Sequence, residues 1–78
     1  MSHDLIPLSQ LPIGRRGTIG AVVGKPDDVH RLEELGMRTG TEVEMLQTGS
    51  PCIIRLSGNK LCFRADELLR ILVRSEDA

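Results

Sequence analysis

Aromatic residues are nearly absent from this sequence of 78 residues: it has no tryptophan and no tyrosine, and Phe63 is its one phenylalanine. The hydrophobic core must therefore be built from Leu, Ile, Val and Met. An aromatic platform on which nucleic-acid bases could stack is also missing. A chain of this length buries only about 60% of its unfolded surface, as one small domain. We therefore expect one domain over 1–78, with 1–4 and 75–78 frayed.

The sequence also lacks an excess of charge and any long apolar run. Ten Lys and Arg oppose eleven Asp and Glu, which leaves a net charge of −1. This balance gives no long-range attraction to nucleic acid or to an anionic membrane. No apolar stretch approaches the roughly 20 residues of a membrane-spanning helix, and the N-terminal residues do not resemble a signal peptide. We therefore expect a soluble cytoplasmic protein.

Cysteine and histidine are too few and too scattered for a strong metal motif. Cys52 and Cys62 lie ten positions apart without a CxxC, and His30 falls within a predicted helix. Zinc sites and catalytic triads both need side chains that converge, which this spacing does not predict. The stretch 20–25 is one residue too short for a phosphate loop and is followed by Pro26 rather than Ser or Thr. The sequence predicts neither an enzyme nor a cofactor, and at most weak transition-metal binding.

What the sequence does contain is an amphipathic helix over about 26–35. Val29, Leu32 and Leu35 recur at three-residue spacing, so one side of the helix should face the core. A proline followed by two aspartates suits the start of this helix, because proline needs no donor in the first turn and acids favour the positive end of the helix dipole.

Two glycines follow this helix and predict sharp turns. Gly36 should end the helix in a Schellman motif, in which Met37 contacts Leu32. Gly40 allows a second turn. The residues 42–47 then alternate between polar and apolar, which is typical of a strand with one buried face.

The rest of the chain predicts short strands and helical turns. Leucines at 5, 8 and 11 suggest a helical turn near 8–11 that packs inward, and a second turn is expected near 65–69. Gly20 predicts a bulge or the close approach of another backbone. Strands are expected over 18–23, 52–56, 61–64 and 71–73, in addition to 42–47. About five short strands with one inserted helix describe a mainly β fold, a small and partly open barrel.

The sequence further predicts a hairpin around the glycine at position 58. With Gly58–Asn59 as a two-residue loop, the cross-strand pairs would be Leu56 with Leu61, Ile54 with Phe63, and Arg55 with Cys62. In this register the two cysteines lie on opposite faces of the hairpin. We therefore expect Cys52 in the core, Cys62 in solvent, and no disulfide.

Exposed charges are the remaining candidates for a function. Arg55 and Arg64 should project outward beside Glu42 and Glu44, where cross-strand ion pairs of little energetic worth are the simplest interpretation. Four other arginines are candidates for contact with a partner protein, since charged side chains on turns and on an exposed helix face often serve binding. These candidates are Arg15, Arg16, Arg31 and Arg38.

The sequence resembles the FeoA family of bacterial ferrous iron transport in three segments: Leu8 to Gly14, Arg31 to Thr41 and Ile53 to Arg64. The resemblance implies an SH3-like β-barrel with the helix inserted between strands. It also implies a cytoplasmic adaptor that acts on the GTPase portion of the membrane transporter FeoB and meets the membrane only through that partner. Thr39 stands where the family often has proline, a tolerable change in a turn.

Two alternatives remain open beside the adaptor. One is a metal-responsive or metal-storing module, in which Cys62, His30 and surface acids bind iron or zinc within one chain or across a dimer. The other is a repressor-type SH3-like domain that binds a proline-rich peptide, although the usual aromatic groove is missing. An uncovered strand edge could also support a homo-oligomer.

Overall fold

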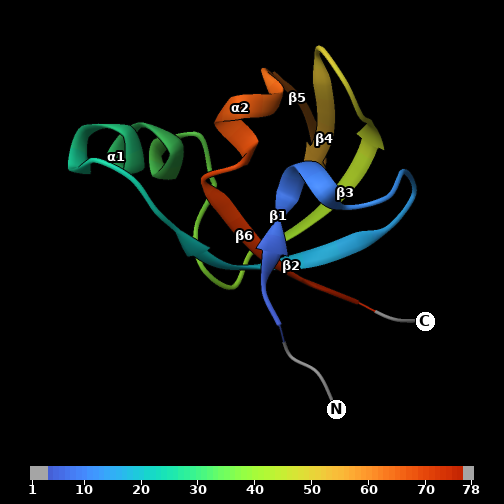
Figure 1. Ribbon diagram of the computed structural model, residues 1–78, viewed down its shortest axis with the longest axis horizontal. Coiled ribbons are helices and arrows are strands. Elements are labelled where there is room, and N and C mark those ends of the chain that lie inside the picture. The colour runs from blue at the N-terminus through green and yellow to red at the C-terminus, as the bar shows by residue number, and fades with distance from the viewer. Residues whose placement is uncertain (1–3, 77–78) are drawn as a thin grey trace.

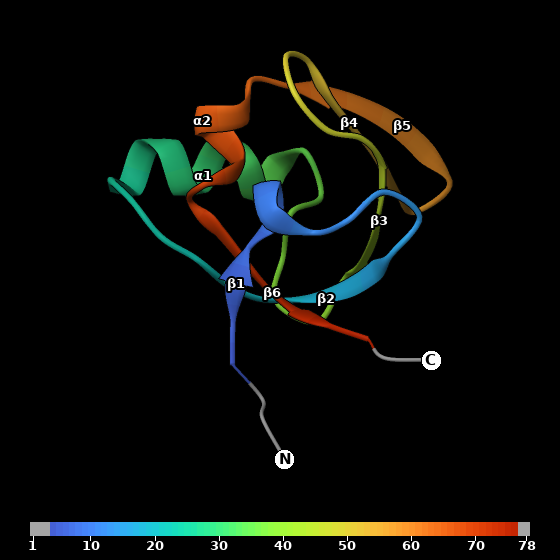
Figure 2. The same ribbon diagram turned by 45° about the vertical axis from the view of Figure 1, so that its right-hand side comes forward.

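The computed structural model describes residues 4–76, and of Ala65 only the backbone. One antiparallel sheet, in the order β1-β6-β2-β3-β4-β5, curls around the core (Figures 1 and 2). Its strands are β1 (Ile6–Pro7), β2 (Arg16–Val22), β3 (Glu42–Gln47), β4 (Cys52–Leu56), β5 (Asn59–Phe63) and β6 (Ile71–Ser75). The sheet is covered by a 3-10 turn, η1 (Leu8–Gln10), and two helices, α1 (Pro26–Glu34) and α2 (Ala65–Leu68).

The core is aliphatic, as predicted. Every element except β1 contributes at least one buried apolar side chain, and β1 adds the partly buried Ile6. Phe63, at the end of β5, is the one aromatic member of the core. No polar or charged residue among those described is buried. The fold therefore rests on the burial of aliphatic side chains, which contributes a free energy of about 25 cal/mol for each Å² of apolar surface removed from water.

Helix α1 ends as the sequence predicts. Gly36 has a φ of 105°, and its N–H donates to the carbonyl of Glu33 at 3.0 Å. The N–H of Met37 donates to the carbonyl of Leu32, also at 3.0 Å. These two bonds are the pair that defines a Schellman motif. Leu32 and Met37 are both buried in the core, so the stop also fixes where the chain re-enters the sheet.

Leu35 does not face the core, contrary to prediction. Its side chain is 46% exposed, whereas Leu32 is buried and Val29 is half-buried. Leu35 is the C-cap residue that follows α1, and the chain turns away from the helix at Gly36. The helix thus buries a narrower stripe than its three-residue repeat suggested.

The N-terminal segment also differs in part from prediction. Leu8 and Leu11 are buried at η1, as expected, but the residues before η1 form the short strand β1. Leu5 is consequently 38% exposed and lies over Gly20, where an added Cβ would come within 2.5 Å of its Cδ2 atom. The pairing of β2 with β6 shifts at Gly20. Gly20 is therefore both a bulge and a site of close approach, although to a side chain and not to another backbone.

The hairpin register predicted from the sequence is wrong by two residues. The loop is Ser57–Gly58, and the predicted pairs are replaced by Leu56 with Asn59, Arg55 with Lys60, Ile54 with Leu61, Ile53 with Cys62, and Cys52 with Phe63. The physical reason lies in the loop, because Ser57 and Gly58 have φ values of 52° and 83°, the positive pair that a two-residue type I′ turn requires. Asn59 already belongs to β5, so the loop lies one residue earlier than predicted and every cross-strand pair moves by two. Because side chains alternate, a shift of two leaves every residue on its predicted face, and Cys52 is buried while Cys62 is exposed.

Gly36→Ala should lower the free energy of unfolding by about 1 kcal/mol or more, because a Cβ disfavours positive φ. An added Cβ would also lie 3.0 Å from Cδ2 of Leu56. Gly40→Ala is the matched control, since Gly40 has a φ of 91° and nothing within 4 Å of an added Cβ. Denaturant midpoints should rank wild type above Gly40→Ala, and Gly40→Ala above Gly36→Ala. A wild-type midpoint for Gly36→Ala would contradict the strained helix stop.

The two thiols should react at very different rates. Cys62 is exposed, whereas Cys52 is buried and its thiol donates to the carbonyl of Gly49 at 3.0 Å. A thiol reagent should therefore modify Cys62 in the native protein and Cys52 only after unfolding. The reaction is followed by absorbance, and Cys62→Ser should abolish the fast phase, which is the modification of Cys62, without changing the modification of Cys52. Equal rates for both thiols in native protein would show that the faces of the hairpin are misassigned.

Candidate docking surface

The four candidate arginines do not form one patch. Arg15 precedes β2 and Arg16 begins it, whereas α1, which carries Arg31, follows the far end of β2. The loop before β2 and the helix α1 accordingly lie on opposite sides of the molecule (Figure 1). Arg16 pairs in register with Glu44, so this pair of arginines stands beside acidic residues of β3. Any docking surface must therefore use one side or the other.

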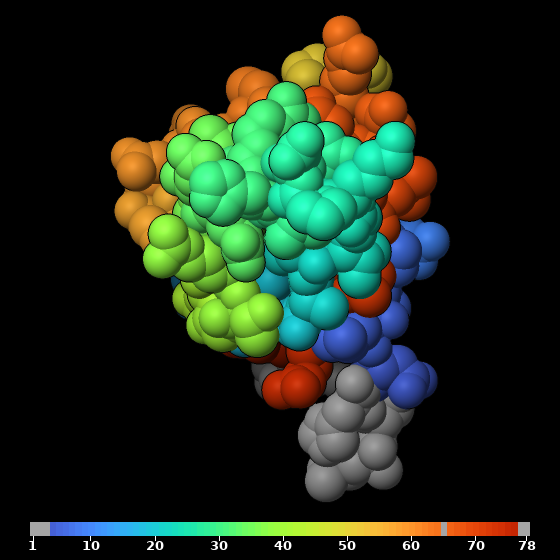
Figure 3. Space-filling view, turned by 90° about the vertical axis from the view of Figure 1, so that its left-hand side faces the viewer, coloured from blue at the N-terminus to red at the C-terminus, as the bar shows by residue number. Residues whose placement is uncertain are grey.

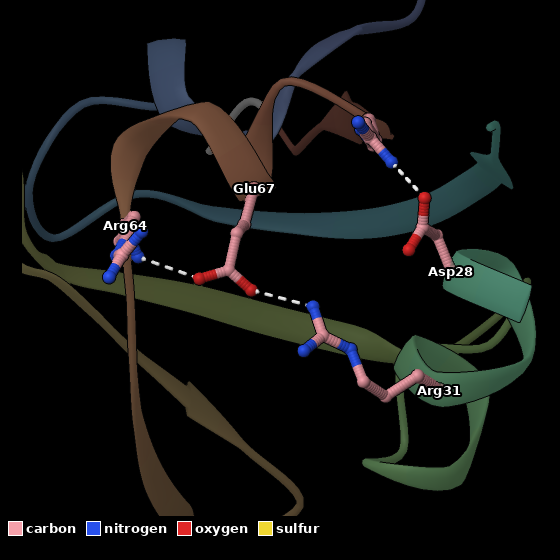
Figure 4. Close-up of polar contacts among 5 residues, drawn as sticks. Asp28, Arg31, Arg64 and Glu67 are labelled. Carbon is pink, nitrogen blue, oxygen red and sulfur yellow. Dashed lines mark hydrogen bonds and ion pairs between the residues drawn. The ribbon is translucent and has the colours of Figure 1, made fainter. Parts of the chain in front are cut away.

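On the α1 side, one carboxylate connects three elements. Glu67 of α2 accepts a hydrogen bond from the guanidinium of Arg31, with Nη2 3.1 Å from Oε2. Its other oxygen, Oε1, accepts the backbone N–H of Arg64 at 3.3 Å. Figure 4 shows Glu67 between the two arginines. We call Arg31, Glu67 and Arg64 the Glu67 bridge, which joins α1 to the end of β5.

A second ion pair lies beside this bridge. The guanidinium of Arg70 contacts the carboxylate of Asp28, near the start of α1 (Figure 4). The backbone of Arg70 also accepts the N–H of Val23, which anchors it to the end of β2. Exposed ion pairs usually contribute about 0–1 kcal/mol each. They matter more here, because Leu32 is the one fully buried side chain of α1.

Between α1 and α2 lies a pocket of about 150 Å³, which we call the α1–α2 cleft. It is lined by Asp28, Arg31, Leu32, Asp66, Glu67 and Arg70. In the space-filling view, α1 spreads over the centre of the face with the C-terminal part of the chain above it (Figure 3). The lining is charged and both of its arginines are already paired with acids. This arrangement suits exchange of ion pairs with a partner protein better than binding of an apolar ligand.

Arg38 lies just past the other end of α1. Its Nε donates to the carbonyl of Glu33 at 3.2 Å, which places a cation at the negative end of the helix dipole. A shallow hollow beside it is lined by His30, Glu33, Glu34, Arg38 and Thr39. Arg38 is exposed, and within residues 4–76 its guanidinium forms a hydrogen bond to a backbone carbonyl but no ion pair, so it can reach a partner without separating two charges.

The part of the chain that the structure describes contains no cluster of metal-binding side chains that would support the metal alternative. Over residues 4–76, no three His, Cys, Asp or Glu side chains are placed to share a metal ion. His30 lies on α1 with its Nδ1 atom 3.0 Å from Glu34, whereas Cys62 lies on β5. Over the same residues, no helix is long and apolar enough to cross a membrane.

The outer face of the sheet carries the ion pair that the sequence predicts. Glu44 and Arg55 are cross-strand neighbours, and their charged atoms are 3.5 Å apart. One interaction there was not foreseen: a hydrogen bond with Glu76, together with the charge of Glu76, raises the pKa of Glu42. Glu76 also accepts a hydrogen bond from Thr18. Spacing alone could not reveal a contact between residues so far apart in sequence.

Glu67 and Asp28 were likewise missed as members of the candidate surface. Glu67 follows Arg64 by three positions, which is the spacing at which a helix-start glutamate reaches back to an N–H. That signal could have predicted the local half of the bridge. The half that reaches Arg31 depends on tertiary packing and had no local signal.

Comparison with known protein families settles the wider relationship. The family model for the FeoA domain matches residues 6–75, nearly the whole chain. The chain belongs to the FeoA family. This family is associated with ferrous iron transport, and its members are small accessory domains, not known enzymes. A search of curated proteins gave no match.

Solved structures agree with this assignment. A FeoA from Stenotrophomonas maltophilia, solved with zinc and described as a prokaryotic SH3 domain protein, is 30% identical, with a TM-score of 0.78 over 87% of this chain and 88% of that one. An iron uptake regulatory protein, also a FeoA, gives a TM-score of 0.87 at 23% identity, over 94% of this chain and 100% of that one. The fold also matches a manganese-dependent transcriptional repressor bound to manganese, with a TM-score of 0.86 at 15% identity, over 96% of this chain and 38% of that one.

The fold of this FeoA domain should respond to pH through Glu42. The pKa of Glu42 is raised in the folded state, so protonation of Glu42 stabilises the fold. This stabilisation is fully present below the unfolded pKa of 4.5 and is lost as the pH rises through the folded pKa. Glu42→Gln keeps a donor toward Glu76 at every pH. The variant should therefore have a higher urea midpoint than wild type at pH 7 and the same midpoint at pH 4. An equal difference at both pH values would contradict this account.

Proposed function

We propose that this protein is a cytoplasmic, non-enzymatic accessory protein that binds the GTPase domain of a FeoB-like membrane transporter and regulates it. The observation that carries the proposal is the FeoA-domain match over residues 6–75, which links the chain to ferrous iron transport. A small domain in such a system acts by contact with a larger component. The proposal therefore requires a surface on which that contact forms.

The α1 side supports such a contact better than the loop before β2. It carries a cleft, two ion pairs that a partner's charges can exchange with, and the exposed guanidinium of Arg38. The Schellman stop holds the end of α1 in one direction, so Arg38 is presented on a fixed backbone. A preorganised surface loses less conformational entropy on binding. We assign the partner contact to Arg31 and Arg38, with Arg15 and Arg16 as the competing site.

Arg38→Glu should weaken binding of the isolated GTPase domain by about tenfold, equivalent to about 1.4 kcal/mol, because it reverses a charge at the centre of the proposed contact. The change spares the core and both ion pairs of the cleft, but it removes the hydrogen bond to Glu33, so the denaturant midpoint of the variant is measured first and the affinity is compared per folded molecule. Calorimetry with the full chain and the GTPase domain of the transporter from the same organism would measure the loss.

Arg74→Glu is the matched control, because Arg74 is exposed on β6, away from α1, and the change in net charge is the same. Its affinity should stay within about twofold of wild type. If only the double variant Arg15→Glu, Arg16→Glu loses affinity for the GTPase domain, the contact lies at the loop before β2. No binding by wild type would refute the proposed partner.

A further inference from the structure

Strand β5 leaves one edge of the sheet open. It pairs with β4 on one side, and no strand in the described part of the chain pairs with it on the other. The opposite edge of the sheet belongs to β1, which has only two residues. Backbone N–H and C=O groups along an open edge can form a ladder with another strand. β5 is therefore the longer edge on which a strand could be added.

The hairpin geometry identifies the free backbone groups. The two loop residues, Ser57–Gly58, have φ values of 52° and 83°, the positive pair of a type I′ turn. The residues that flank such a loop, Leu56 and Asn59, form a hydrogen-bonded pair, and bonded and non-bonded pairs alternate from there. Lys60 and Cys62 thus fall in non-bonded pairs with β4. Their N–H and C=O groups point toward the open edge.

The edge ends at the Glu67 bridge. Next in the same alternation is Arg64, but its N–H donates to Glu67 Oε1 and its carbonyl accepts the N–H of Glu67. The available ladder therefore consists of the two N–H and two C=O groups of Lys60 and Cys62. A shallow hollow continues beyond it, lined by Ser50, Pro51, Cys62, Phe63, Arg64 and Glu67. The hollow therefore lies next to the end of the open edge.

The charges along the edge are all positive on one face. Lys60, Cys62 and Arg64 alternate along β5, so their exposed side chains share the outer face. Lys60 stands opposite Arg55, and no acidic side chain of the described residues pairs with it. If two copies paired symmetrically about Cys62, Lys60 of each copy would lie beside Arg64 of the other. The edge therefore disfavours its own copy and favours an acidic strand.

We propose that the β5 edge binds an extended acidic segment of a partner protein by antiparallel strand addition. Two acidic residues four positions apart lie beside Lys60 and Arg64, and the residue midway between them lies beside Cys62. The two intervening residues are apolar and cover Leu61 and Phe63. The identity of the partner rests on the function proposed above, whereas the mode of binding rests on the edge itself.

The first test uses a peptide that is independent of any transporter. An acetylated and amidated peptide, Glu-Val-Thr-Val-Glu, is titrated into the ¹⁵N-labelled full chain, with Lys-Val-Thr-Val-Lys as the control peptide. The amides of Lys60 and Cys62 should show the largest shifts and become protected from hydrogen exchange, and the basic peptide should have no effect. No binding by the acidic peptide, or shifts confined to other residues, would overturn the proposal.

Two variants test the backbone and the charge separately. Cys62→Pro removes an N–H that points away from β4, a position at which edge strands tolerate proline, and Cys62→Ser keeps that N–H. The proline variant should bind the acidic peptide at least tenfold more weakly, and the serine variant within twofold of wild type. Lys60→Glu should also bind the acidic peptide at least tenfold more weakly. Because this variant keeps every backbone N–H, it tests the proposal even where the proline variant misfolds. Unchanged affinity for Lys60→Glu would overturn the proposal.

The GTPase domain then separates this inference from the proposed function. If it binds wild type and a folded Cys62→Pro equally well, the partner is right and the strand addition is wrong. If it does not bind wild type, but the acidic peptide protects Lys60 and Cys62, the edge site stands and the partner is wrong. Weaker binding of the domain to Cys62→Pro, with Cys62→Ser unchanged, supports both.

Discussion

The fold depends on packing aliphatic side chains between a strongly curved sheet and three short covers. With one phenylalanine in the core, each buried leucine, isoleucine, valine or methionine carries a large share of the whole. Burying one such side chain contributes about 1.5–3 kcal/mol, against a net stability of only a few kcal/mol for a small domain. Helix α1 supplies one fully buried residue, Leu32, to this core. Its position therefore depends on polar ties to a degree that the strands do not share.

One of those polar ties runs through α2. A four-residue helix is too short to be stable alone, yet Glu67 reaches both Arg64 and Arg31. The end of β5 and the face of α1 are thus linked through a single carboxylate. A partner that draws Arg31 away would leave Glu67 with its backbone contact alone, so events on the helix and at the strand edge are coupled through the position of one side chain. This link makes the two regions one continuous surface.

Local patterns predicted those features that local physics determines. The helix stop at Gly36 and the bounds of β4 follow from glycine conformation and alternation, and both are observed. The hairpin faces were correct although its register was not, because a shift of two preserves alternation. Strand β1 was missed because two residues are too few to show the alternation of polar and apolar side chains that marks a strand. The Arg31–Glu67 contact spans 36 positions, and only the folded chain brings its members together.

Strands β1 and β6 are antiparallel neighbours at one side of the sheet, with Ile6 opposite Val73. One leads into η1 and the other follows α2, so both short covers sit at the same end of this strand pair, and the chain enters β1 and leaves β6 at the other end (Figure 2). A covalent attachment at either end of the domain is thus directed away from α2. The fold can be joined to a longer polypeptide through one end and still present Glu67 and its neighbours to solvent.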